Sequence, residues 1–91
     1  MSMENRVAVV AKITSAPGKR ADLAKALNDA QKFVEGEPGT LHYILNEDLT
    51  DENVLWMWEM YTDQDALNAH MGSQWFKDWG PSLAPFMGGR P

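Results

Sequence analysis

The run from Val54 to Tyr61, VLWMWEMY, carries the clearest hydrophobic pattern in the chain, because a single charge interrupts apolar and aromatic side chains. Its length and aromatic content predict a β-strand. Successive side chains of a strand point to opposite faces. One face would carry Val54, Trp56, Trp58 and Met60, and the other Leu55, Met57, Glu59 and Tyr61. Both faces are largely apolar, so we expect this strand to be covered on both sides.

Two further segments show the alternation of strands, and one long segment shows the spacing of a helix. We predict strands over Arg6–Thr14 and Thr40–Glu47. The polar connection 48–53 is short enough for a hairpin into the strand that begins at Val54. Apolar side chains recur every three or four residues over Lys19–Glu35, which predicts one amphipathic helix.

The segment 62–86 predicts two short helices. Thr62 or Asp63 can cap the first of them, which carries His70 on its apolar face. Ser73 can cap the second, and two prolines farther along oppose a long regular run.

The order of these elements predicts an α+β domain. An antiparallel or mixed sheet would carry the helices on one face only. The opposite face would then expose a large apolar patch, which monomeric proteins rarely leave to water. Packing against a second copy with two-fold symmetry would cover it. We therefore predict a homodimer that forms through the sheet face carrying Trp56 and Trp58.

Composition and charge narrow the range of partners. The 91 residues suit a single domain, 1–91, with loose tails expected at 1–5 and 87–91. The formal net charge of −5 disfavours nucleic acid and anionic membranes as partners. The sequence has no cysteine, no run long enough to cross a bilayer and no visible export signal. We therefore expect a cytoplasmic protein without disulfides or thiolate chemistry.

Several short motifs occur in a fixed order along the chain. They are Pro17-Gly18-Lys19 before a helix, Glu37-Pro38-Gly39 before a strand with Tyr43, Glu59 late in the third strand, and Asp65-Ala66-Leu67 leading to His70, Ser73 and Phe76. In this set, from about Val7 to Phe86, the sequence resembles the antibiotic biosynthesis monooxygenase (ABM) family. The resemblance implies a ferredoxin-like dimeric α+β barrel, with a pocket in each subunit between the helices and the sheet.

The resemblance also implies a range of activities. Better-known members oxygenate quinols or aromatic polyketides without metal or flavin, relatives degrade haem, and others isomerise or break down small signalling molecules. Haem-degrading members have a ligand histidine near Gly80 and an asparagine near Ala11, and this sequence has neither. Many members have histidine where this chain has Trp75, and the usual fourth strand is short or missing here. We therefore expect no cofactor.

His70 is the leading candidate for a catalytic residue. A neutral imidazole on the apolar face of a helix could take a proton from a phenolic substrate. Glu59 could orient that imidazole, or act as an acid with a raised pKa. The structural alternatives are a buried His70 bonded to a backbone carbonyl or to Glu59, and a Glu59 paired across the sheet or the dimer. His42 is expected to be structural, and two distant histidines give little support for a metal site.

These observations lead to one functional hypothesis and two alternatives. The hypothesis is a cofactor-independent, monooxygenase-like enzyme that uses oxygen to oxidise a small aromatic quinol or polyphenol. The pocket walls would be Met57, Tyr61, Trp75 and Phe76, although aromatic residues at helical spacing are also typical of an ordinary core. One alternative is an isomerase or degrading enzyme for a small oxygenated metabolite. The other is a non-enzymatic ligand-binding or dimerisation module.

Overall fold

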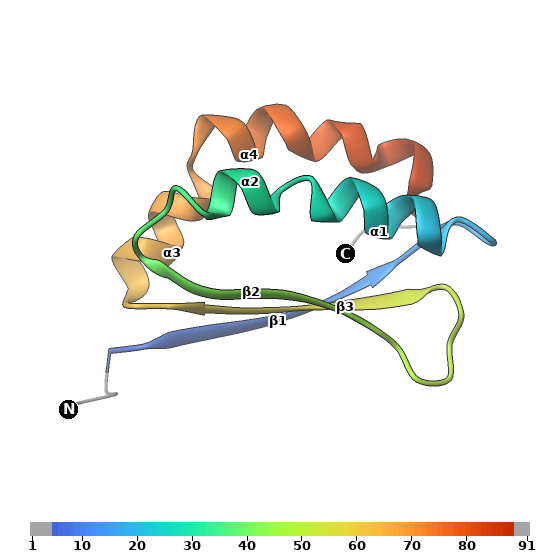
Figure 1. The fold of residues 1–91 in the computed structure, drawn as a ribbon, viewed down its shortest axis with the longest axis horizontal. Helices are drawn as coiled ribbons and strands as arrows, with labels where there is room; N and C mark the ends of the chain where they lie inside the picture. Colours follow the sequence, from blue (N-terminus) through green and yellow to red (C-terminus); the bar gives the residue numbers. More distant parts are fainter. Residues whose placement is uncertain (1–4, 89–91) are drawn as a thin grey trace.

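A three-stranded antiparallel sheet forms one layer of the protein, as the computed structural model shows for residues 5–88 (Figure 1). The strands are β1 (Val7–Thr14), β2 (Thr40–Glu47) and β3 (Val54–Tyr61), in the spatial order β1-β3-β2. The strand with the most apolar sequence, β3, is therefore the central one. The three strands predicted from the sequence are confirmed, and β2 and β3 form the predicted hairpin.

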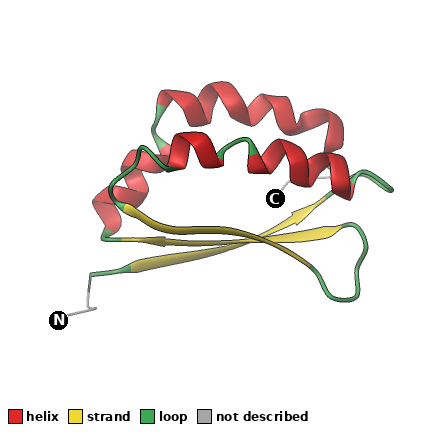
Figure 2. Ribbon diagram, in the orientation of Figure 1, coloured by secondary structure: helices red, strands yellow, loops and turns green. Residues whose placement is uncertain are grey.

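The helices form a second layer, which covers one face of the sheet (Figure 2). They are α1 (Arg20–Asn28), α2 (Gln31–Val34), α3 (Gln64–Met71), α4 (Gln74–Trp79) and the 3₁₀ helix η1 (Gly80–Phe86). None of the helices within the described residues is long and apolar enough to cross a bilayer.

The single helix predicted over Lys19–Glu35 is wrong in its continuity, because α1 and α2 are separate. The backbone stays in the right-handed helical region at Asp29 and Ala30, but the N–H of Ala30 bonds to the carbonyl of Leu27, three residues back. Such bonds tighten the turn into a 3₁₀ geometry. The apolar stripe itself continues through this tightened turn and is buried at Leu23, Leu27, Ala30 and Val34.

The core lies between the helices and one face of the sheet. Leu55, Met57 and Tyr61 of β3 are at most 2% exposed. Leu23 and Leu27 of α1 pack in the same cluster as Leu55 and Met57. The helices therefore cover the face of β3 that carries Met57 and Tyr61, and the face with Trp58 is left open.

The chain returns to β1 at the end of η1. Met87 pairs with Ser15, and the N–H of Gly88 donates to the carbonyl of Thr14 at 2.9 Å. The expectation of a loose tail is therefore wrong for Met87 and Gly88. The other tail residues, 1–4 and 89–91, lie outside the described part of the chain.

Candidate functional site

His70 lies at the centre of a buried aromatic cluster between α3 and the sheet. Asp63 caps α3, as one of the two predicted caps, by accepting a hydrogen bond from the N–H of Ala66 at 2.8 Å. The imidazole of His70 is only 2% exposed. Four aromatic rings surround it, with centroids 5.3 to 5.5 Å away, and they belong to Tyr43, Tyr61, Trp75 and Phe76.

Glu37 is the carboxylate in hydrogen-bond contact with His70. Its Oε1 atom lies 2.8 Å from His70 Nδ1 and also accepts a bond from the hydroxyl of Thr40. Its other oxygen, Oε2, accepts a hydrogen bond from the indole N–H of Trp75 at 3.0 Å. Burial raises the pKa of Glu37, but the hydrogen bonds from His70, Trp75 and Thr40 outweigh it and bring that pKa below the ordinary value. In the tautomer that carries its proton on Nδ1, His70 donates to the ionised Glu37, and the lone pair then lies on Nε2.

Gly39 allows the turn that carries Glu37 to approach α3 closely. A Cβ atom at position 39 would lie only 2.6 Å from the Cβ of Ala66. The carbonyl of Gly39 also accepts a hydrogen bond from the N–H of Thr62, which joins the turn to the end of β3. The turn is therefore held where Glu37 can reach the buried imidazole.

Glu59 faces the other side of the imidazole without a hydrogen bond to it. Its Oε1 atom lies 4.0 Å from His70 Nε2, which is too long for a hydrogen bond. The hydroxyl of Tyr61 donates to the same oxygen at 2.5 Å. Burial raises the pKa of Glu59, and the Tyr61 hydroxyl and the charge of His70 offset this only in part. The hydrogen bond to the ring of His70 therefore comes from Glu37, and Glu59, which was predicted to orient this ring, approaches it only to 4.0 Å.

The predicted wall residues divide into two groups. Tyr61, Trp75 and Phe76 all pack against His70, whereas Met57 lies in the core cluster with Leu55. Ser73 precedes α4 as predicted, but its hydroxyl donates to the carbonyl of His70 at 2.8 Å and makes no cap bond.

Tyr43 and Glu37 belong to the cluster but were not among the predicted site residues. Tyr43 occupies the position opposite Glu59 in the pairing of β2 with β3. Burial, followed by the nearby carboxylates Glu59 and Glu37, raises the pKa of the Tyr43 hydroxyl. The regular alternation of β2 placed Tyr43 on the covered face, which was the available signal for it. Nothing local in the sequence marked Glu37 as the partner of His70.

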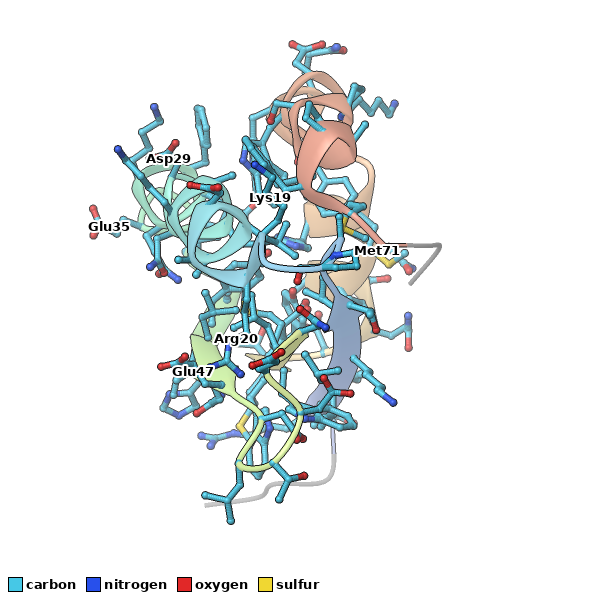
Figure 3. All side chains as sticks on the ribbon, turned by 90° about the vertical axis from the view of Figure 1, so that its right-hand side faces the viewer. Lys19, Arg20, Asp29, Glu35, Glu47 and Met71 are labelled. Atoms are coloured by element: carbon cyan, nitrogen blue, oxygen red, sulfur yellow. The ribbon has the colours of Figure 1, made fainter. Side chains whose placement is uncertain are left out.

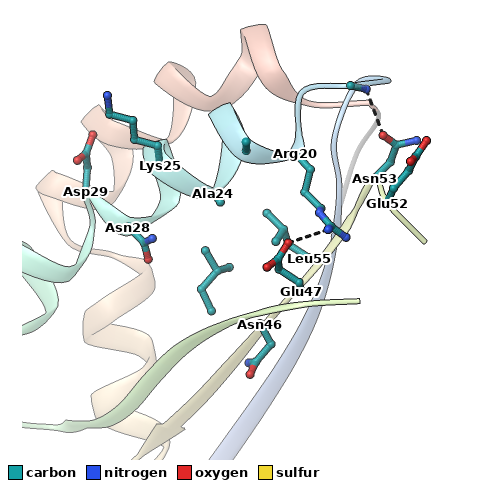
Figure 4. Close-up of a pocket in the computed structure, with 13 residues that line it drawn as sticks. Arg20, Ala24, Lys25, Asn28, Asp29, Asn46, Glu47, Glu52, Asn53 and Leu55 are labelled. Carbon is teal, nitrogen blue, oxygen red and sulfur yellow. Dashed lines mark hydrogen bonds and ion pairs between the residues drawn. The ribbon is translucent and has the colours of Figure 1, made fainter. Parts of the chain in front are cut away.

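A hollow that is separate from the His70 cluster lies between α1 and the β2–β3 hairpin (Figure 4). Its volume is about 900 Å³, and its lining includes Arg20, Asn28, Asn46 and Glu47. Arg20 and Glu47 point toward each other and form an ion pair of 2.7 Å (Figure 3). The same guanidinium donates to the carbonyl of Asp51 at 2.9 Å, so Arg20 binds the hairpin to α1. None of the predicted site residues lines this hollow.

The remaining histidine, His42, is exposed on β2. Within residues 5–88 no group of three or more His, Cys, Asp or Glu side chains is arranged to hold a metal ion.

The sequence model of the family described as antibiotic biosynthesis monooxygenase matches residues 6–81. The chain belongs to this ABM family. Members of the family are typically dimeric. No curated protein matches the chain.

Solved structures share the fold of this ABM protein over nearly the whole chain. A candidate antibiotic biosynthesis monooxygenase from Caulobacter crescentus CB15 is 36% identical, with a TM-score of 0.87, over 94% of this chain and 82% of that one. PA3566 from Pseudomonas aeruginosa is 26% identical, with a TM-score of 0.82, over 98% of this chain and 90% of that one. Rv0793 from Mycobacterium tuberculosis is 28% identical, with a TM-score of 0.80, over 94% of this chain and 86% of that one. These similarities confirm the predicted ferredoxin-like α+β fold.

The hydrogen bonds of Glu37 lead to a prediction about stability. Replacing Glu37 by glutamine should lower the free energy of unfolding at pH 7 by about 1–2 kcal/mol, because it removes the charge that accepts these bonds. A group with a lowered folded pKa contributes stability above its unfolded pKa, ordinarily 4.5, and loses it as pH falls through the folded pKa. The deficit of the variant should therefore shrink in that acidic range.

Urea unfolding of both proteins at several pH values measures this difference. Glu35→Gln is the matched control, because Glu35 is an exposed carboxylate two residues away, and it should change stability by less than about 0.5 kcal/mol. A deficit that stays constant from neutral pH to pH 3 would contradict a charged Glu37 as its cause.

Proposed function

We propose that this ABM protein is a cofactor-independent, monooxygenase-like enzyme that oxidises a small aromatic quinol or polyphenol. The observation that carries the proposal is the pairing of His70 Nδ1 with Glu37 at 2.8 Å inside a cluster of aromatic rings. An imidazole fixed by a carboxylate in this way has its other nitrogen available as a general base.

The chemistry requires only one proton-accepting group from the protein. Nε2 of His70 takes the phenolic proton, and the ionised Glu37 stabilises the resulting imidazolium. The phenolate then supplies the electrons that reduce oxygen. One oxygen atom enters the aromatic ring system and the other leaves as water, so the substrate is both the reductant and the acceptor of oxygen.

Glu59 has a second role in this proposal. Its carboxyl group faces Nε2 at 4.0 Å, and its raised pKa favours the protonated form relative to an ordinary glutamate. A hydroxyl or carbonyl oxygen of the substrate bound near Nε2 would therefore meet both a base and a hydrogen-bond donor. Tyr61 fixes the orientation of Glu59 through its 2.5 Å hydrogen bond.

The enclosure of His70 favours a second candidate function. Its ring is 2% exposed and packed on several sides, which also suits a histidine that only stabilises the fold. The chain would then be a non-enzymatic module that binds a ligand or dimerises. Such a module is distinguished by thermal stabilisation with a bound phenol and no product.

We further propose that the working form is a homodimer built on the uncovered face of the sheet. Val10, Trp58 and Ile44 lie in register across the three strands, and each is more than half exposed. Hollows of about 420 and 310 Å³ are both lined by Val10 and Trp58. An indole of one copy in a hollow of the other would satisfy a two-fold interface. Trp56 is partly buried and donates to Asp48 at 2.8 Å, so Trp58 is the principal contact.

Oxygen consumption with a panel of hydroquinones tests the enzymatic proposal. We expect protein-dependent oxygen uptake that continues in the presence of a metal chelator, with one quinone product formed per oxygen consumed. Turnover of the same compounds under anaerobic conditions would instead identify an isomerase or a degrading enzyme. Ligand binding without either reaction would contradict the proposal and support the non-enzymatic module.

A further inference from the structure

We propose that the groove between α2 and α4 is the outer binding site for the planar aromatic substrate, with Trp75 as the wall that separates it from His70. The inference rests on the proposed function. It adds the place where the substrate first binds and the residue that controls its access to the base.

The groove is lined mainly by aromatic side chains of the two helices. Its volume is about 440 Å³, within the range of small-molecule sites, and its lining residues are Asp29, Lys32, Phe33, Trp75, Asp78 and Trp79. Phe33 and Trp75 stack with centroids 5.0 Å apart and planes within 9° of parallel. The indole N–H of Trp79 donates to the carbonyl of Ala26 at 3.2 Å, which fixes its ring at the edge of the groove.

These side chains suit a flat, hydroxylated ring system. Aromatic ligands bind favourably against aromatic walls by stacking and edge contacts. Lys32, whose ammonium lies 5.1 Å from the centre of the Phe33 ring, would attract a phenolate. Asp29 and Asp78 offer acceptors for phenolic hydroxyl groups. A quinol or polyphenol presents both the ring faces and the hydroxyl groups that this lining can bind.

Trp75 is shared between the groove and the buried cluster. One ring system contacts Phe33 in the groove and also lies 5.4 Å from the imidazole of His70, centroid to centroid. Its N–H holds Glu37, the partner of that imidazole. A ligand in the groove is therefore one side chain away from the base.

The helix that carries Trp75, α4, is held to the rest of the protein mainly by its aromatic side chains. No residue of α4 is buried, and Ser73 at its start makes no side-chain cap bond. Segments with few buried contacts open locally at low free energy. Turning the Trp75 ring aside costs its hydrogen bond to Glu37 and its stacking on Phe33, and a stacked aromatic ligand can replace the second contact.

Binding is tested with 1-naphthol, a bicyclic phenol, in the absence of oxygen, so that the probe cannot be oxygenated during the titration. The four tryptophans give four indole N–H signals in ¹⁵N-labelled protein, which Trp-to-Phe variants assign. We expect titration to shift the signals of Trp75 and Trp79 and to leave those of Trp56 and Trp58 in place. Shifts confined to Trp56 and Trp58, or no shift at millimolar 1-naphthol, would overturn the outer site.

The role of Trp75 as the side chain that covers His70 is tested by chemical modification of the two histidines with diethyl pyrocarbonate. His42 is exposed and His70 is buried, so His42 serves as an internal standard in peptide mass spectra. Trp75→Leu should raise the modification rate of His70 relative to His42 by about tenfold or more, because it removes the covering ring. Trp79→Leu, which alters the same groove from the position beside Trp75, should have a much smaller effect.

Trp75→Phe separates opening from unfolding, because it keeps a ring on Phe33 and removes only the N–H bond to Glu37. We expect His70 in this variant to be modified at a rate between those of the wild type and Trp75→Leu, with a melting temperature close to that of the wild type. Equal rates of His70 modification in the wild type and in a folded Trp75→Leu protein would overturn the role of Trp75.

The binding and activity experiments can fail separately. If 1-naphthol binds at Trp75 and Trp79 but hydroquinones consume no oxygen, the proposed function is wrong and the groove remains a binding site. If hydroquinones are oxidised but 1-naphthol shifts neither signal, only the proposal of the groove as a binding site is wrong.

Discussion

Replacing His70 by alanine is expected to lower kcat for hydroquinone oxidation by roughly 10²-fold or more, the usual contribution of a positioned general base. The reason is that Nε2 of His70 is the atom assigned to take the phenolic proton, while Nδ1 is held by Glu37 at 2.8 Å. The measurement is steady-state oxygen uptake at saturating substrate, so that a change in binding does not hide the change in the chemical step.

The matched control for this experiment is His42→Ala. His42 is exposed on β2, so the same substitution there tests for a general effect of losing a histidine. His70→Gln provides a second variant, because an amide can still bond to Glu37 and fill part of the cavity. The two His70 variants should both lose activity, although the glutamine protein should be the more stable one. Turnover at the wild-type rate by a folded His70→Ala protein would show that His70 is not the base.

The fold was predictable because its signals are local and repeated. The alternation in Thr40–Glu47 and the apolar, aromatic run Val54–Tyr61 gave the bounds of both strands. Asp63 was recognisable as a cap because it stands directly before an apolar-periodic segment. The break between α1 and α2 was not predictable, because the apolar stripe runs through it without interruption.

The site was predictable only for the residues whose position follows from one element. His70 was noticed because a polar ring stands on the apolar face of α3, and Tyr61 and Glu59 follow from the alternation of β3. Glu37 is distant from His70 in sequence and lies in a Glu-Pro-Gly turn, which by itself indicates only a bend. Its contact with His70 depends on the close approach of Gly39 to α3, and this is a property of the packed chain.

Replacing Trp58 by aspartate is expected to raise the dissociation constant of the proposed homodimer by roughly 10³-fold or more, because it would remove a central aromatic anchor and place a charge in an apolar interface. Trp58 is 58% exposed in the single chain, between Val10 at 55% and Ile44 at 51%. Analytical ultracentrifugation over a range of concentrations measures the change, with a wild-type dimer and a largely monomeric variant as the expected result.

Met71→Asp is a closely matched control for this substitution. Met71 is also 58% exposed, but it lies on α3, in the layer on the other side of the sheet (Figure 3). If any exposed apolar side chain could drive association, both variants would dissociate alike. If the interface is the row of Val10, Trp58 and Ile44, only Trp58→Asp should do so, because β1, β3 and β2 bring these three side chains together on one face and the helices cover only the opposite one. A wild-type protein that sediments as a monomer at micromolar concentration would exclude this interface, and a Trp58→Asp protein that stays dimeric would place the contact elsewhere.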